Sequence, residues 1–215
     1  MPDGSASHPS HSLKPMMPHS AHLKFNSKSE MKYSRLSILP LMMVAASVVV
    51  SSCNDDDKST WEQYKEWREA NEAYYDTQKY MMEDGENVYT TLTPSWNSGA
   101  SILIRYLSDR SKTEGNLSPM LNSTVKVKYI GRLYNDVAFD SSYLRPDSVS
   151  LFNVSEVVPG WTTALQYMRV GDSARIVLPY MQAYGVSGSS SGSIPPYSTL
   201  VFNLKLVDIV DYERP

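Results

Sequence analysis

The chain has 215 residues and a formal net charge of −3, a length that fits one domain with extensions. Its single cysteine excludes an intramolecular disulfide bond. All four histidines lie within the first 22 residues, which excludes histidine-based nucleophilic catalysis and histidine-ligated metal sites from the rest of the chain.

Residues 1–30 are rich in Ser, Pro and His and show no apolar periodicity. Such a segment cannot bury enough apolar surface to fold, so it is predicted to be a disordered leader. The alternative is that Met31 is the true start and that residues 1–30 are an over-extended reading of the gene.

A secretory signal peptide is predicted over residues 31–52. Lys32 and Arg35 precede an apolar run over residues 38–50, and small residues follow before Cys53. The run is too short for a comfortable transmembrane helix. The segment VVSSC resembles the lipobox of bacterial lipoproteins, which implies cleavage before Cys53 and a lipid on that cysteine. The alternative is a plain cleaved signal with an incidental thiol.

The acidic segment NDDDK follows Cys53, so residues 53–58 resemble the tether of surface-exported Bacteroidetes lipoproteins. The alternative is a solvated linker. We expect the chain to lie in the cell envelope, lipid-anchored to the outer membrane. The sequence leaves open whether it is on the periplasmic or the outer face of that membrane. The remaining chain would carry a net charge of about −6 and shows no basic stripe interleaved with aromatic residues, which argues against a nucleic-acid partner.

Residues 59–100 are predicted to be a helical extension, with a helix over residues 59–82. Ser59 or Thr60 can cap it, and Glu62 or Gln63 would complete a capping box. An aromatic stripe recurs at spacings of three and four: Trp61, Tyr64, Trp67, Asn71, Tyr74, Tyr75, Gln78 and Met81 or Met82. This stripe is expected to dock on the following domain or to pair with a second copy in a homodimer.

Residues 101–215 are predicted to contain several antiparallel strands. We expect these strands at residues 101–109, 124–134, 149–154, 173–180 and from residue 200 onward. Gly131 predicts a bulge or bend in the second strand, where apolar residues alternate with Lys and Arg. Residues 107–124 are polar and read as a loop.

In the last strand, one face is predicted to be buried and the other exposed. The buried face comprises Leu200, Phe202, Leu204 and Leu206, and the other face comprises Val201, Asn203 and Lys205. A Gly/Ser run and Pro195–Pro196 lead into this strand, and such a loop either borders a pocket or is a plain connector.

A short helix is predicted between the third and fourth of these strands. Pro159 and Gly160 open it, Trp161, Leu165 and Met168 share a face, and Gly171 closes it. The predicted fold class is therefore α+β: antiparallel strands with one short helix between them and a helical extension in front.

Four segments, in this order and spacing, resemble the FKBP family of peptidyl-prolyl cis-trans isomerases: VKYIGRLYNDVAFDSS, VVPGWTTALQYMRVGDSARIVLP, AYG and IPPYSTLVFNLKLVDI. The resemblance covers about residues 124–209. It implies an antiparallel sheet wrapped around the short helix, with an apolar pocket between them. The Gly/Ser run would then be a flap over this pocket, and residues 194–196 its rigid return.

The resemblance implies which residues form the pocket. The catalytic set is Tyr129, Phe139, Asp140, Trp161, Tyr184 and Phe202, and the substrate-binding set is Val157, Val158, Ile194 and Phe152. Trp161 would be the floor beneath the prolyl ring, with Phe139 and Phe202 as walls. Tyr184 would offer its hydroxyl to a substrate carbonyl, and Asp140 would position groups by hydrogen bonding. For each residue alone, simple core packing is the alternative.

The implied reaction requires no nucleophile, metal or cofactor, since rotation about a prolyl amide breaks no bond. Its substrates would be proline-containing polypeptides, and macrolide inhibitors of the tacrolimus class would be candidate ligands. Two departures from the family pattern are Ser150, where a large apolar residue is usual, and the Ser189–Ser191 run in the flap. Both are expected to lower activity or broaden substrate choice without abolishing catalysis. Ser150 also favours an alternative function, a non-catalytic binding or chaperone module on the same fold.

Overall fold

The computed structural model describes residues 59–211, which all belong to one unit of the chain, residues 52–215. The predicted leader, the signal peptide, the lipidation site at Cys53 and the acidic tether all lie outside the described residues. Within the described part, no helix is both long enough and apolar enough to cross a membrane.

The extension begins with a short helix, α1 (Thr60–Gln63), and continues after a turn at Tyr64 as α2 (Lys65–Lys79). Ser59 caps the first turn, because its hydroxyl accepts a hydrogen bond from the Glu62 amide. The predicted helix and its cap are confirmed, although the helix ends at Lys79 and not at residue 82.

Residues 80–100 form turns and short strands instead of continuing the helix. β1 (Met82–Glu83) and β2 (Glu86–Asn87) make a hairpin, and Gly85 in its turn has a φ of 85°. β3 (Thr90–Leu92) pairs with β4 (Ile102–Tyr106) as an edge strand of the main sheet. The helical part of the extension is therefore shorter than predicted, because Gly85 and the β-branched residues after it favour turn and strand.

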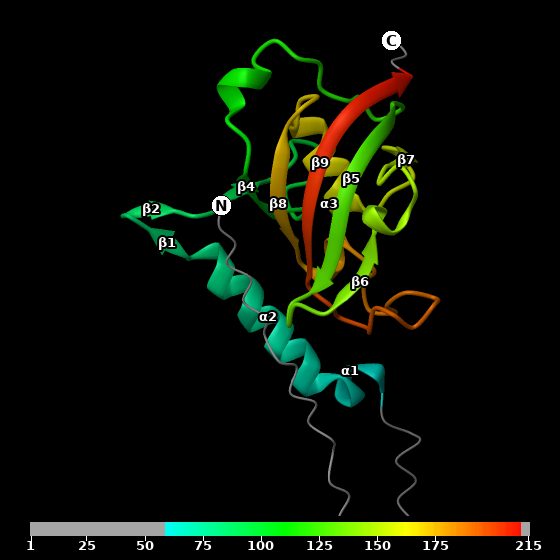
Figure 1. The fold of residues 1–215 in the computed structure, drawn as a ribbon. Helices are drawn as coiled ribbons and strands as arrows, with labels where there is room; N and C mark the ends of the chain where they lie inside the picture. The colour runs from blue at the N-terminus through cyan, green and yellow to red at the C-terminus, as the bar shows by residue number, and fades with distance from the viewer. Residues whose placement is uncertain (1–58, 212–215) are drawn as a thin grey trace, which may run out of the picture. The chain divides into compact units, whose positions relative to one another are not determined.

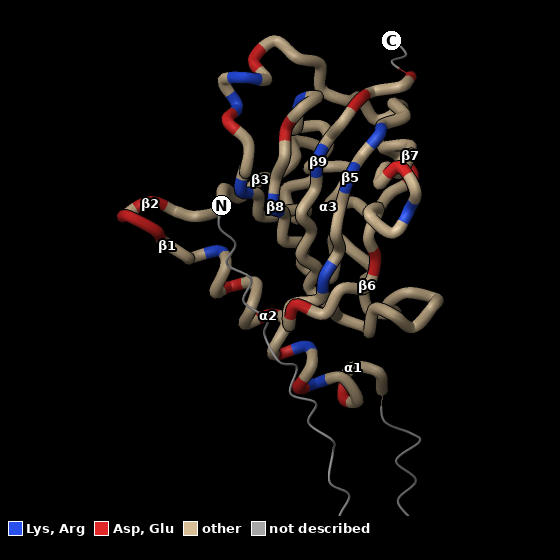
Figure 2. Tube along the Cα trace, viewed as in Figure 1, with Lys and Arg blue, Asp and Glu red and all other residues tan. Residues whose placement is uncertain are grey.

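A single antiparallel sheet holds β3, β4 and the remaining strands (Figure 1). These are β5 (Thr124–Leu133), β6 (Ala138–Ser141), β7 (Ser150–Asn153), β8 (Ser173–Leu178) and β9 (Leu200–Asp211). The order is β3-β4-β8-β9-β5-β6, and β7 also pairs with β5. β5 alternates buried and half-buried residues along its length, and its basic residues, blue in Figure 2, occupy the half-buried positions, as predicted.

The main core lies between this sheet and α3 (Pro159–Tyr167), so the predicted α+β class is confirmed. Trp161, Leu165 and Met168 are all buried in this core, as their spacing predicts. The helix ends at Tyr167, and Gly171 lies beyond it in a turn with a φ of 97°. Gly171 therefore does not close the helix itself.

A second apolar cluster covers the opposite face of the sheet. Leu103, Val177 and Val201 from three adjacent strands are buried there with Tyr89, and Tyr74 and Tyr75 of α2 pack against them. Val201 was predicted to lie on the exposed face of β9. That prediction is wrong because α2 and the segment before β3 shield this part of the sheet from water.

The aromatic stripe of α2 packs on the chain's own sheet domain, which is the first of the two predicted alternatives. Trp67 and Tyr74 lie against Tyr134, with ring centroids 5.1 and 6.0 Å apart. Asn71 is fully buried and hydrogen-bonds to Thr199. The stripe is therefore occupied by contacts within the chain.

The polar loop between β4 and β5 is tied to the sheet by a buried carboxylate. It contains the 3-10 helix η2 (Arg110–Thr113). Asp172 accepts hydrogen bonds from the Thr113 hydroxyl at 2.6 Å and the Arg169 amide at 2.9 Å, and lies 3.3 Å from the Arg110 guanidinium. A fully buried carboxylate needs such partners, so these contacts fix the loop.

Gly160 lies where α3 touches β8, and a Cβ there would lie 2.5 Å from Leu178 Cδ2 and 2.9 Å from the Gln182 carbonyl oxygen. We expect Gly160→Ala to lower the free energy of unfolding by about 1–3 kcal/mol, although Ala is the better helix former. Chemical denaturation measures this change. Gly99→Ala is the control, since its Cβ would approach no atom closer than 3.5 Å. Equal stability of the two variants would contradict the close packing at Gly160.

Candidate active site

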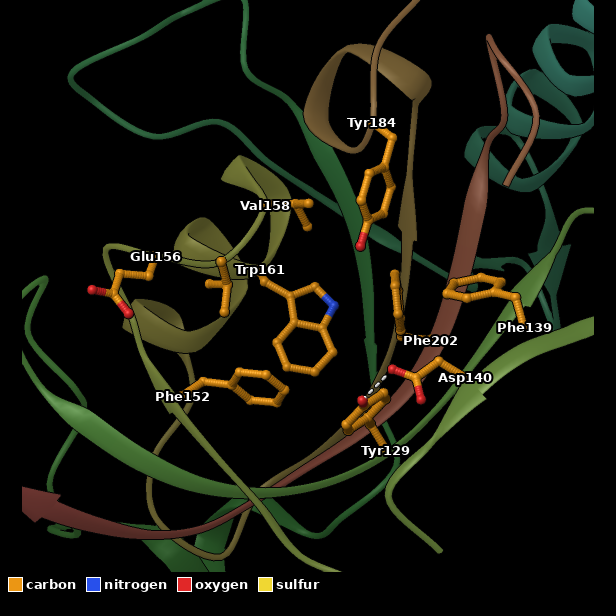
Figure 3. A pocket seen from close by; sticks show the side chains of 10 residues that line it. Tyr129, Phe139, Asp140, Phe152, Glu156, Val158, Trp161, Tyr184 and Phe202 are labelled. Atoms are coloured by element: carbon orange, nitrogen blue, oxygen red, sulfur yellow. Dashed lines mark hydrogen bonds between the residues drawn. The ribbon is translucent and has the colours of Figure 1, made fainter. Parts of the chain in front are cut away.

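A pocket of about 280 Å³ opens between α3 and the sheet. Its side chains come from β5, β6, β7, β9, α3 and the loops that flank them (Figure 3). The lining residues are Tyr129, Phe139, Asp140, Phe152, Glu156, Val157, Val158, Trp161, Tyr184 and Phe202. The pocket therefore brings together residues up to 73 positions apart in the chain, from Tyr129 to Phe202.

The floor of the pocket is the indole of Trp161, which is almost fully buried. Tyr129, Phe152 and Phe202 each meet it edge to face, with ring centroids 5.1, 5.6 and 5.2 Å away. This is the arrangement that aromatic quadrupoles favour, so the three strands hold the indole in one orientation. Phe139 packs on Phe202 in the same way, at 5.6 Å, and extends the wall.

The Phe139–Phe202 wall exists because β5 has a glycine beneath it. A Cβ on Gly131 would lie 2.6 Å from Phe139 Cζ and 2.7 Å from Phe202 Cε1. The β5–β6 register also shifts between Gly131 and Arg132, which confirms the predicted bulge. Gly131 thus leaves the space in which the two rings meet.

A hydrogen-bonded pair of side chains forms the polar edge of the pocket. The Tyr129 hydroxyl donates to Asp140 Oδ2, and Asp140 Oδ1 accepts from the Ser141 amide at 2.8 Å. Burial raises the pKa of Tyr129 to about 12, and the hydrogen bond to Asp140 adds to the rise. The phenol therefore stays protonated and remains a donor throughout the neutral and mildly alkaline range.

The pocket also contains one buried donor without a partner within residues 59–211, and a second hydroxyl points into it. The buried Trp161 Nε1–H makes no hydrogen bond, and it faces the side of the pocket where Tyr184 and Phe202 lie (Figure 3). The Tyr184 hydroxyl points into the pocket from the opposite side to Tyr129 (Figure 3). Burial raises the pKa of Tyr184, and the charge of Asp140 raises it further. Both groups therefore face the space that a ligand would occupy.

Comparison with known proteins shows which family this region resembles. Residues 115–207 match the family model of FKBP-type peptidyl-prolyl cis-trans isomerases. These residues therefore resemble an FKBP-type domain in sequence.

Two curated relatives show the extent of the similarity. The chain is 44% identical over 101 residues to the macrophage infectivity potentiator of Trypanosoma cruzi, covering 47% of this chain and 50% of that protein. It is 36% identical over 124 residues to the FKBP-type 22 kDa peptidyl-prolyl cis-trans isomerase of Escherichia coli, covering 50% and 59%. The chain thus spans half to three fifths of the length of these relatives.

Two crystal structures resemble the fold over more of the chain than the matched residues 115–207. A peptidyl-prolyl cis-trans isomerase from Pseudomonas syringae pv. tomato aligns with a TM-score of 0.55 and 28% identity, over 69% of this chain and 96% of that one. FkpA from Escherichia coli aligns with a TM-score of 0.54 and 29% identity, over 69% and 63%.

The pocket gathers all but one of the residues that the sequence analysis assigned to it. The exception is Ile194, which is buried in the main core and is not a lining residue. Its backbone amide donates to Ser189 Oγ and its carbonyl accepts from the Ser189 amide, so the neck of the loop is closed at this residue. The side chain packs among core residues below this neck.

The Gly/Ser run forms a loop closed by its own hydrogen bonds, and residues 186–193 are not among the lining residues. The pocket meets this loop only at Tyr184, so the predicted flap does not line the pocket in this structure.

Two further residues differ from what the sequence suggests. Ser150 is buried at the start of β7, opposite Val127, and does not line the pocket. Glu156 lines the pocket although the sequence analysis did not name it. Its position directly before Val157 and Val158 was the available signal.

The raised pKa of Tyr129 predicts a loss of stability at high pH. Below pH 10 the phenol is protonated in both states; between pH 10 and about 12 the unfolded chain ionises first, which favours unfolding. We expect the free energy of unfolding to fall over this range, and to fall less in Tyr129→Phe. Denaturant titrations at several pH values measure this difference. Tyr80→Phe, at an exposed position, is the control, and a fall equal to that of the parent in Tyr129→Phe would contradict the assignment.

Proposed function

We propose that this chain is a peptidyl-prolyl cis-trans isomerase that assists the folding of exported proteins. The observation that carries the proposal is the aromatic pocket around Trp161, whose buried indole N–H has no partner among the described residues. Support also comes from the FKBP-type family model and from the isomerase names of the relatives.

In the proposed complex, the prolyl ring of the substrate stacks on the Trp161 indole between Phe139 and Phe202. These side chains offer an apolar surface that fits a ring of methylene groups. The Tyr184 hydroxyl donates to a carbonyl that flanks the prolyl bond. Asp140 contributes by orienting Tyr129, because both of its carboxylate oxygens already accept hydrogen bonds.

The chemistry of such a pocket is rotation, with no bond made or broken. The resonance of the amide sets a barrier of ~18–20 kcal/mol in water. The twisted amide is less polar than the planar one, so an apolar pocket stabilises the transition state relative to the ground state. Fixed donors that bind the flanking carbonyl groups add to this difference without reorganising.

The alternative function is a binding or chaperone module that holds proline-containing segments without turnover. Ser150 was the feature of the sequence that favoured it, but this residue does not line the pocket. We therefore rank catalysis first. Macrolides of the tacrolimus class are proposed as competitive ligands of the same pocket under either function.

We also propose that the chain is a lipoprotein of the Bacteroidetes type, anchored to the outer membrane through Cys53. This proposal rests on the sequence of residues 31–58: two cations, an apolar run, small residues before the cysteine and an acidic segment after it. A homodimer through α2 is not proposed, because its aromatic stripe already packs on the sheet domain.

Replacement of the pocket floor tests the proposed catalysis. We expect Trp161→Leu to lower kcat/KM for a short Xaa-Pro peptide by about tenfold or more, because the variant loses the edge-to-face contacts and the ring surface. The cis-to-trans rate of the peptide, measured with and without the full chain, provides the readout. Trp96→Leu is the matched control, since this indole is 61% exposed and does not line the pocket. A parent chain that leaves the uncatalysed rate unchanged would leave the binding module as the function.

Removal of the cysteine tests the proposed anchor. We expect Cys53→Ser to move the chain from the membrane fraction to the soluble fraction of the cells that produce it, because no thiol remains to carry a lipid. Immunoblotting of the two fractions measures the change. Ser52→Ala keeps a small residue before the cysteine and is the control. Equal membrane association of Cys53→Ser and the parent would contradict lipidation.

A further inference from the structure

The loop that carries Tyr184 is held at two points. The Gly185 amide donates to the Tyr180 carbonyl at 2.9 Å, and the Gly185 carbonyl accepts from the Tyr197 amide at 3.0 Å. Tyr184 directly precedes this doubly bonded residue. The position of its side chain over the pocket is therefore set by Tyr180 and Tyr197.

The unusual backbone conformation of Tyr197 is accompanied by close packing of neighbouring side chains on its ring. It has a φ of 61°, in the left-handed region that bulky residues rarely adopt. Its buried ring lies between two others, 5.4 Å from Tyr180 and 5.5 Å from Trp61 at the start of the helical extension. The Arg68 guanidinium covers the Trp61 ring at 3.5 Å from its centroid. Trp61 thus packs on one side of Tyr197, and Arg68 in turn packs on Trp61.

The two residues after Tyr197 are bound by α2. The Trp67 Nε1–H donates to Ser198 Oγ at 3.2 Å. The Thr199 amide donates to Asn71 Oδ1 at 2.7 Å, and the Thr199 hydroxyl donates to the Asn71 carbonyl at 3.1 Å. The Asn71 Nδ2–H in turn donates to the Trp67 carbonyl at 2.7 Å. Three consecutive residues of the loop return therefore contact the helical extension.

Asn71 is an unexpected residue for the middle of a helix. Asparagine is a poor helix former, and this one is completely buried. Its side-chain oxygen supplies the partner of a buried amide just before β9 begins, a group that would otherwise be left without one. Asn71 thus gives the Thr199 amide its hydrogen-bond partner, although asparagine lowers the helix propensity of α2.

We infer that α1 and α2 position Tyr184 in the pocket, through Asn71 and Trp67 on residues 198–199 and through Trp61 on Tyr197. The inference rests on the proposed isomerase function. Asn71 touches no lining residue of the pocket directly and acts through the loop, so it is a positioning residue. Helices outside the matched FKBP region thereby set the geometry of the active site.

The test compares Asn71→Ala with Thr77→Ala in the full chain. Thr77 lies on the same helix and also hydrogen-bonds to a carbonyl four residues earlier, but it is exposed and does not reach the sheet domain. We expect Asn71→Ala to raise KM for an Xaa-Pro peptide and to lower kcat/KM by about fivefold, the loss expected for one mispositioned hydrogen bond. Thr77→Ala should match the parent.

A double-mutant cycle with Tyr184→Phe separates positioning from general destabilisation. If Asn71 acts through the Tyr184 hydroxyl, Asn71→Ala should cost little further activity once that hydroxyl is gone. Fully multiplicative effects of the two substitutions would overturn the inference. Trp67→Phe, which keeps a ring against Tyr134 and removes only the donor to Ser198, serves if Asn71→Ala does not fold.

Hydrogen exchange gives a readout that does not depend on catalysis. The amides of Tyr197 and Thr199 should exchange faster in Asn71→Ala than in Thr77→Ala. If Asn71→Ala exchanges faster than Thr77→Ala but the parent chain is not an isomerase, the proposed function fails and the link between α2 and the loop still holds. Unchanged exchange would overturn the inference even if the parent is an active isomerase.

Discussion

The Trp161 indole, held edge-on by three rings from three different strands, is the interaction on which the pocket depends. Tyr129, Phe152 and Phe202 can meet this indole only if β5, β7 and β9 curve around the N-terminal end of α3. Gly160 allows α3 to approach β8, and Gly131 allows Phe139 to meet Phe202. Two glycines and five aromatic side chains thus determine where the cavity lies and how wide it is.

The proposed chemistry suits a chain with few reactive side chains. The described residues contain no cluster of three or more His, Cys, Asp or Glu that could bind a metal. Rotation of an amide needs only an environment that favours the twisted form. The pocket provides this environment with its aromatic rings, the Trp161 indole N–H and the Tyr184 hydroxyl. The raised pKa of Tyr129 and Tyr184 keeps both phenols neutral, which preserves the donors and avoids a buried negative charge.

Local patterns of the sequence predicted much of the fold. The alternation in β5, the cap at Ser59 and the bulge at Gly131 are short-range features, so one sequence contained enough information to predict them. The lining residues were predicted from the resemblance to the FKBP family, since aromatic residues in a small sheet domain are otherwise read as core.

Long-range contacts account for what the sequence did not reveal. Val201 is buried because α2, more than 120 residues earlier in the chain, covers that face of the sheet, and no pattern within β9 records this. β3 is too short to show an alternation and exists as a strand because β4 lies beside it. Ile194 points to the core because of hydrogen bonds at the neck of the loop, which the Gly/Ser composition does not predict.

The second apolar cluster means that the evolutionary unit and the folding unit of this protein have different boundaries. The family match begins at residue 115, whereas β4, which pairs with β8 and buries Leu103, ends at Tyr106. A fragment cut at the limits of the match would expose Val177 and Val201 to water and leave an edge of β8 unpaired. Both changes favour aggregation. The smallest piece of this chain that keeps both faces of its sheet covered therefore starts at the helical extension.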